Sequence, residues 1–188
     1  MISFLELPPL LGVVGLFTAL VLYRSILKED AGDGLVKKIG DQIHLGAMVF
    51  MQREYKMLGL FSAVLIIAIL VSPLGVNTAL AFLCGAVSSA LAGYLGMFSG
   101  TKANVRTAVA ANNQGAAKSL SIAFLGGSVM GLCVASLGLM GLGGLYFYLG
   151  GDPDTAHAIH GFGMGASTVA LFSRVGGGIF TKSADVGA

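Results

Sequence analysis

The apolar residues of this chain fall into five long runs, separated by short polar, glycine-containing or proline-containing breaks. The runs cover residues 8–27, 57–75, 77–99, 118–149 and 157–181. A helix of about 20 apolar residues is long enough to cross the hydrocarbon core of a bilayer. The pattern therefore predicts an all-α, multi-pass transmembrane helix bundle. About five helices would span the membrane, within a single transmembrane domain over residues 1–188.

The breaks between the runs predict how the spans are connected. Residues 28–56 are polar, and we expect a loop through the lysines at 37–38, followed by a helix that leads into the second span. Proline and glycine at 73–75 are expected to break the chain between the second and third spans. The stretch at 112–115 contains Asn and Gly, and the stretch at 150–154 contains Gly, Asp and Pro. They are predicted to form the turns before the fourth and fifth spans.

The composition agrees with a membrane protein. Of the 188 residues, 55% are hydrophobic and only 11% are charged, whereas soluble domains carry about 25% charged residues. A net charge of +2, without a zinc-finger or basic-stripe pattern, argues against nucleic acid as a partner. The 29 glycines follow no fixed period, and they predict close helix packing because small residues let helix backbones approach each other in lipid.

Every lysine and arginine falls on one side of the membrane if the five spans alternate in direction. These bases are Arg24, Lys28, Lys37, Lys38, Arg53, Lys56, Lys102, Arg106, Lys118, Arg174 and Lys182. The opposite side carries Glu6, Asp152 and Asp154 and no base. Cytoplasmic loops are enriched in Lys and Arg. The pattern therefore predicts a cell-membrane protein with its N-terminus outside and with Lys182 and Asp185 in the cytoplasm.

The end of the fifth run carries charged residues at helical spacing. Arg174, Gly178, Lys182 and Asp185 fall within an arc of roughly 80° on one helix face, because a helix turns about 100° per residue. Charges at the end of a membrane helix are costly unless they face a cavity or a partner. This face is therefore a candidate wall of a polar site at a membrane mouth. The alternative is a helix end whose bases extend to the lipid headgroups.

The run RVGGGIFTKSADVGA at 174–188 resembles the signature motif of membrane-bound, ion-pumping inorganic pyrophosphatases. The segments GAMVFMQREYK at 46–56 and GYLGMFSGTKANVRTA at 93–108 resemble the corresponding segments of that family. The chain differs from the common pattern at Phe180, where Tyr is usual, and at Ser183, where Ala is usual. Because the family motif continues further, the resemblance implies that this chain is the N-terminal part of a longer protein.

The resemblance implies hydrolysis of inorganic pyrophosphate coupled to pumping of H⁺ or Na⁺ out of the cytoplasm. Lys182 would bind a phosphate group, Asp185 would hold Mg²⁺ that travels with pyrophosphate, and Arg174 would belong to the ion path that couples the two processes. The family has sixteen spans in two concentric rings and forms a homodimer, and some members require K⁺. Its catalytic carboxylates lie on later helices, so no catalytic residue is expected within 1–188, and this segment alone is expected to be inactive.

A second hypothesis is a non-enzymatic, glycine-rich membrane pore or structural subunit. The face with Lys182 and Asp185 separates the two hypotheses, because a passive pore has no need for ligands of magnesium and phosphate at a helix end. The sequence does not distinguish H⁺ from Na⁺ as the pumped ion, and it does not decide a requirement for K⁺.

Overall fold

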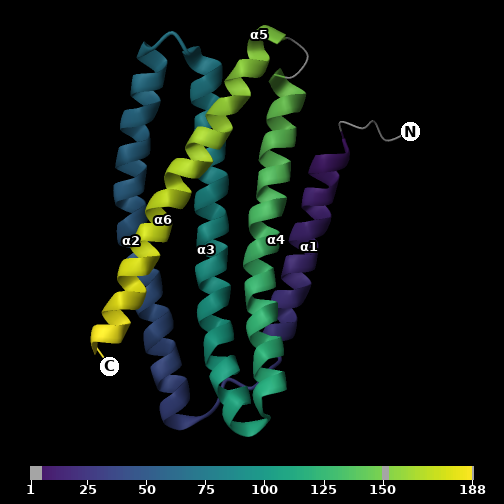
Figure 1. Ribbon diagram of the computed structural model, residues 1–188, viewed down its shortest axis with the longest axis vertical. Helices are drawn as coiled ribbons and strands as arrows, with labels where there is room; N and C mark the ends of the chain where they lie inside the picture. The colour runs from purple at the N-terminus through teal and green to yellow at the C-terminus, as the bar shows by residue number, and fades with distance from the viewer. Residues whose placement is uncertain (1–5, 150–152, 188) are drawn as a thin grey trace.

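The computed structural model describes residues 6–149 and 153–187, and within them five long helices lie side by side (Figure 1). The long helices are α1 (Leu7–Leu27), α2 (Gly34–Val71), α3 (Gly75–Asn113), α4 (Ala116–Leu149) and α6 (His160–Gly187). A short helix α5 (Pro153–Ala156) and a 3-10 turn (His157–Ile159) connect α4 to α6. All of these elements are helical, which confirms the predicted all-α class.

Four of the long helices have the length and apolar composition of membrane spans. Helices α1 to α4 each contain a segment with mean hydropathy between 1.6 and 2.0 and few charged residues. Among the described residues α6 does not reach that composition, because glycine and charged residues interrupt its apolar positions. Its 28 residues nevertheless extend over about 42 Å at about 1.5 Å per residue. The multi-pass membrane class is thus confirmed with four spans, and a fifth crossing by α6 stays a prediction.

Helix α3 is the centre of the bundle. It packs against α2, α4 and α6, and α1 packs mainly on α4. In Figure 1 the helices α2, α3, α4 and α1 stand next to one another, and α6 runs obliquely across α2 and α3. One buried cluster joins α2, α3 and α6 through residues such as Leu58, Phe82 and Val169. A second joins α1, α3 and α4 through residues such as Ile26 and Val129.

The helix boundaries differ from the predicted ones at the polar ends. The loop predicted through the lysines at 37–38 is wrong, because α2 already begins at Gly34 and both lysines lie in its first turns. The chain turns just before it: the Gly32 amide donates to Asp30 Oδ1 at 2.8 Å, and Gly32 and Gly34 both have positive φ. The apolar period of Val36, Ile39 and Ile43 then continues as helix into the predicted second span.

Helix α3 extends well past the predicted third span at 77–99. It continues to Asn113, and the turn follows at Gln114 and Gly115, within the predicted 112–115. The segment after Ser99 is therefore helical up to the predicted turn, and several of its polar side chains bond back to carbonyls of the same helix. Arg106 Nη1, for example, donates to the Lys102 carbonyl at 2.9 Å.

The other two breaks also have defined positions. Helix α2 ends at Val71 and α3 begins at Gly75, so a turn at 72–74 interrupts the predicted run 57–75. Ser72 Oγ donates to the Ile69 carbonyl at 2.7 Å at the end of α2. Of the turn predicted at 150–154, residues 150–152 lie outside the described residues, and Pro153 already begins α5. Where the bilayer boundaries fall along these helices stays a prediction.

Helices α3 and α6 touch backbone to backbone where their glycines face each other. A Cβ atom on Gly165 would overlap the Phe82 carbonyl oxygen and would lie 2.8 Å from the Phe82 carbonyl carbon and 2.9 Å from the Ala86 nitrogen. A Cβ on Gly85 would overlap the Phe162 carbonyl oxygen in the same way. These contacts explain why glycine is needed at the crossing of the two helices.

Replacing Gly165 with alanine in the purified whole protein is expected to destabilise it by about 1 to 3 kcal/mol, because the added methyl group meets backbone atoms that cannot rotate away. Gly163→Ala is the matched control on the same helix, since its Cβ would meet nothing within 4 Å in the part of the chain that the structure describes. Thermal unfolding in detergent measures both changes. Equal unfolding temperatures for the two variants would contradict the close crossing.

Candidate functional site

The charged face at the end of α6 is open in this structure. Lys182 Nζ lies 3.5 Å from Asp185 Oδ2, and the two side chains are 77% and 68% exposed. An exposed ion pair of this kind contributes only about 0 to 1 kcal/mol. Both side chains can therefore leave each other at little cost to meet a phosphate group or a metal ion.

Arg174 is exposed on the same face and takes part in none of the ion pairs seen among the described residues. It lies eight residues before Lys182, which corresponds to about 12 Å along the helix axis. The opposite face of α6 packs against α2 and α3 through Val169, Ser173 and Gly176. Helix α6 therefore has one packed face and one charged face, roughly opposite each other.

The described part of the chain contains no group of three or more His, Cys, Asp or Glu side chains close enough to hold a metal ion. Asp185 supplies a single carboxylate. Such a carboxylate fits Mg²⁺ only where phosphate oxygens and water supply the remaining ligands, which is the usual arrangement for Mg²⁺ bound to a phosphorylated substrate. The structure is thus compatible with Asp185 as one ligand of a substrate-borne ion, and not with a preformed metal site in this segment.

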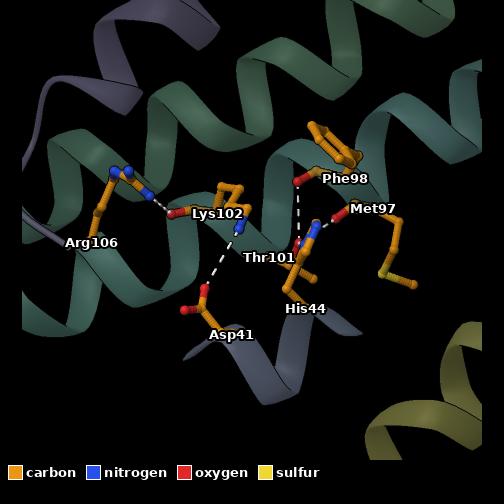
Figure 2. Close-up of polar contacts among 7 residues, drawn as sticks. All are labelled: Asp41, His44, Met97, Phe98, Thr101, Lys102 and Arg106. Carbon is orange, nitrogen blue, oxygen red and sulfur yellow. Dashed lines mark hydrogen bonds and ion pairs between the residues drawn. The ribbon is translucent and has the colours of Figure 1, made fainter. Parts of the chain in front are cut away.

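A second polar cluster lies between α2 and α3 (Figure 2). Lys102 Nζ is 3.8 Å from Asp41 Oδ1, and His44 Nδ1 is 2.7 Å from Thr101 Oγ1. Beside these residues is a cavity of about 280 Å³ that Lys37 and Arg106 also line. From the sequence, Lys37, Lys102 and Arg106 counted only as bases on one side of the membrane. The helical register that brings α2 and α3 together here was the missing signal.

Lys118 on α4 is tied to the loop between α1 and α2. Its Nζ lies 2.6 Å from Glu29 Oε1, and Arg106 Nε on α3 donates to the Glu29 carbonyl at 3.1 Å. Glu29 therefore connects three segments at the base-rich end of the bundle. These contacts hold the loop in place. Of the three ion pairs among the described residues, the pair of Lys182 and Asp185 on α6 has the most exposed side chains.

Glu54 is a polar residue that the sequence analysis did not single out. It lies on α2 against Gly176 of α6, and its Oε1 atom is buried without a hydrogen-bond partner among the described residues. Ser173 Oγ on α6 is buried in the same condition. Buried polar atoms of this kind are costly and are uncommon in folded proteins.

Comparison with known proteins places the chain in a family. Residues 13–188 match the family described as inorganic H⁺ pyrophosphatase. A K(+)-insensitive pyrophosphate-energized proton pump of Methanosarcina mazei is 49% identical over 181 residues, which are 96% of this chain and 26% of that protein. A "Putative K(+)-stimulated pyrophosphate-energized sodium pump" of Clostridium tetani is 49% identical over 187 residues, which are 99% of this chain and 27% of that protein.

A further relative is the K(+)-insensitive pyrophosphate-energized proton pump 2 of Moorella thermoacetica, which is 43% identical over 192 residues. That alignment covers 98% of this chain and 28% of the relative. The chain thus spans about a quarter of the length of these relatives. Because the family match extends over residues 13–188, the chain belongs to the inorganic H⁺ pyrophosphatase family.

Proposed function

We propose that the whole protein to which this chain belongs hydrolyses inorganic pyrophosphate and uses the free energy to pump H⁺ or Na⁺ out of the cytoplasm. The observation that carries the proposal is the family match over residues 13–188 together with the exposed pair Lys182 and Asp185. Relatives described as a proton pump and as a sodium pump are both 49% identical to the chain. Overall identity therefore favours neither ion, and it favours neither K⁺ insensitivity nor K⁺ stimulation.

In this function Lys182 contacts a phosphate oxygen as a flexible point charge. Asp185 holds the Mg²⁺ ion that accompanies pyrophosphate. When bound, the metal neutralises charge on the phosphate oxygens. Because the two side chains lie 3.5 Å apart on one helix face, they can meet neighbouring atoms of a single magnesium-pyrophosphate. Neither residue activates water, so both act as binding groups.

Arg174 is assigned to the coupling of hydrolysis to ion transport. It lies deeper along α6 than the binding pair, on the same exposed face. An arginine stays protonated in proteins, so it can hold a carboxylate of the ion path in one position and release it when nearby charge changes. This role requires α6 to cross the membrane as the fifth span, among the inner helices of a homodimer.

The proposed orientation places the N-terminus outside and the base-rich end in the cytoplasm. The loop at 28–33 and the turn at Gln114 and Gly115 lie at one end of the bundle, and the turn at 72–74 lies at the other (Figure 1). The former end carries the lysines and arginines of the connections between α1 and α2 and between α3 and α4. Such bases favour the cytoplasmic side of a cell membrane.

Hydrolysis and transport by the whole protein in sealed vesicles test the function. Magnesium-pyrophosphate is expected to give phosphate release together with uptake of H⁺ or Na⁺, measured with and without K⁺. Ion leakage that does not depend on pyrophosphate, with no phosphate release, would instead support a passive pore or structural subunit.

Labelling of single cysteines tests the orientation. Cysteines at 33, 74 and 112, in a background without Cys84 and Cys133, occupy exposed positions: 33 and 74 lie in connections between helices, and 112 lies in the last turn of α3. Positions 33 and 112 are expected to react only from the cytoplasmic side, and position 74 only from outside. Labelling of 33 and 74 from the same side would contradict the alternation of the spans.

A further inference from the structure

Glu54 is half-buried, and one oxygen of its carboxyl is enclosed where α2 meets α6. Among the described residues its Oε1 atom is buried without a hydrogen-bond partner, and none of the three ion pairs seen there includes Glu54. Its neighbours Arg53 and Lys56 are exposed. Burial of a carboxyl without partners lowers stability. Unpaired buried polar atoms are uncommon in folded proteins, so this contact is a candidate for a functional role.

Two aromatic contacts between α2 and α6 enclose this carboxyl. On one side Phe50 packs on Phe180 with 5.4 Å between ring centroids. On the other side Phe61 packs on Phe172 at 5.0 Å. Glu54 faces Gly176 between these pairs, as expected for two antiparallel helices in register. The two aromatic pairs thus hold α2 and α6 together on either side of the contact between Glu54 and Gly176.

Gly176 provides the space that the carboxyl occupies. A Cβ atom at this position would overlap Glu54 Oε1 and would lie 2.8 Å from Glu54 Cδ and 3.2 Å from Phe50 Cζ. The two following glycines, Gly177 and Gly178, would meet nothing within 4 Å among the described residues. Within the run of three glycines, this contact with α2 therefore depends on the first one alone.

The α2 side of this contact is itself anchored to α3. Tyr55, next to Glu54, donates from its hydroxyl to the Ala90 carbonyl at 2.6 Å. A Cβ on Gly93 would lie 3.0 Å from the Tyr55 hydroxyl and 4.0 Å from Ser173 Oγ. The position of Glu54 is thus fixed by the central helix, and α6 is held against a rigid support.

We propose that Glu54 is a positioning residue: by filling the space at Gly176 it sets where α6 lies, and thereby where Arg174, Lys182 and Asp185 point. These three residues lie on the face of α6 roughly opposite Gly176. A displacement of α6 at this contact moves all of them together, and misplacement by about 1 Å can cost up to about a hundredfold in rate. The functional consequence rests on the proposed pyrophosphatase activity.

The test compares Gly176→Ala, Glu54→Ala, the double variant and Glu54→Gln in the whole protein. In Gly176→Ala the added methyl group meets the flexible end of the Glu54 side chain, so kcat is expected to fall and the KM for magnesium-pyrophosphate to rise by only about two- to tenfold. The double variant is expected to recover most of the loss relative to Gly176→Ala, because removing the carboxyl makes room for the methyl group. Glu54→Gln keeps the shape and is expected to stay within about twofold of wild type. Gly163→Ala is the control, because its added Cβ would meet nothing within 4 Å among the described residues.

The double variant decides the outcome. If Gly176→Ala does not assemble, recovery of assembly and activity in the double variant supports the proposal, and failure to recover overturns it. Wild-type KM, kcat and ions transported per pyrophosphate in Gly176→Ala would also overturn it. A purely structural role would lower the amount of active protein and leave the KM of the remainder unchanged.

A second measurement separates this proposal from the proposed function. Spin labels at the exposed positions Val36 and Val186 report the distance between α2 and α6. That distance is expected to shift in Glu54→Ala and Gly176→Ala and to return toward wild type in the double variant. Should the wild-type protein fail to hydrolyse pyrophosphate, the proposed function falls, and the distances alone still decide whether Glu54 positions α6. Unchanged distances in both single variants would overturn the positioning role.

Discussion

Replacing Lys182 with alanine is expected to remove most pyrophosphate hydrolysis by the whole protein at low substrate concentration. Its side chain is 77% exposed and makes only an exposed ion pair with Asp185 at 3.5 Å, so the ammonium group can contact a phosphate oxygen. A hydrogen bond to a charged group contributes about 1.5 to 3 kcal/mol. The apparent KM for magnesium-pyrophosphate is therefore expected to rise about ten- to a hundredfold, as measured by phosphate release against substrate concentration.

Matched variants separate substrate binding from the general effect of removing a surface charge. Lys38→Ala removes an exposed lysine from α2 at the same end of the bundle and is expected to leave the KM unchanged. Asp185→Asn keeps the size of the side chain but weakens metal binding, so its loss is expected to be offset in part by higher Mg²⁺. If Lys182→Ala has the KM of wild type, the pair is a surface ion pair and not a substrate site.

The sequence predicted the helices of this protein well, because apolar runs of about 20 residues have few folds open to them other than a membrane helix. It did not predict where α2 begins or α3 ends. The parts of α2 and α3 outside the predicted spans meet through polar side chains such as His44 and Thr101. Hydropathy carries no information on such contacts, since it depends only on residues that are neighbours in the chain.

The charged face of α6 could also be predicted, because its residues lie on one helix and share one period. Glu54 could not. The segment that contains it matched the family pattern, yet only the packing of α2 on α6 shows that its carboxyl meets Gly176. The same packing separates Gly176 from Gly177 and Gly178, which look equivalent in the sequence. Contacts between helices that are far apart in the sequence could not be predicted, because the residue pattern within one helix does not contain them.

Replacing Arg174 with alanine is expected to reduce the number of ions transported per pyrophosphate hydrolysed while the KM stays close to that of wild type. Arg174 lies about 12 Å along α6 from Lys182 at about 1.5 Å per residue, so it is too far along the helix to share the phosphate contact. It is exposed on the charged face and has no ion-pair partner among the described residues. A fixed positive charge in that position suits a carboxylate of the ion path.

Arg53 on α2 provides the matched control for Arg174. Because Glu54 faces Gly176, Arg53 lies at a similar depth to Arg174, and it is exposed as well. Arg53→Ala is expected to leave both hydrolysis and transport unchanged, so a loss in Arg174→Ala would not be a general effect of removing charge at that level. Arg174→Lys keeps the charge and loses the two-pronged geometry of the guanidinium, and it is expected to restore coupling only in part.

Hydrolysis and ion uptake are measured on the same vesicles, because their ratio is the quantity at issue. A protein that hydrolyses pyrophosphate with normal KM but transports fewer ions has lost coupling and kept substrate binding. If Arg174→Ala instead raises the KM as much as Lys182→Ala and leaves the ratio unchanged, Arg174 belongs to the substrate site. In that case the charged face of α6 is one continuous binding surface over about three helical turns, and coupling resides elsewhere in the protein.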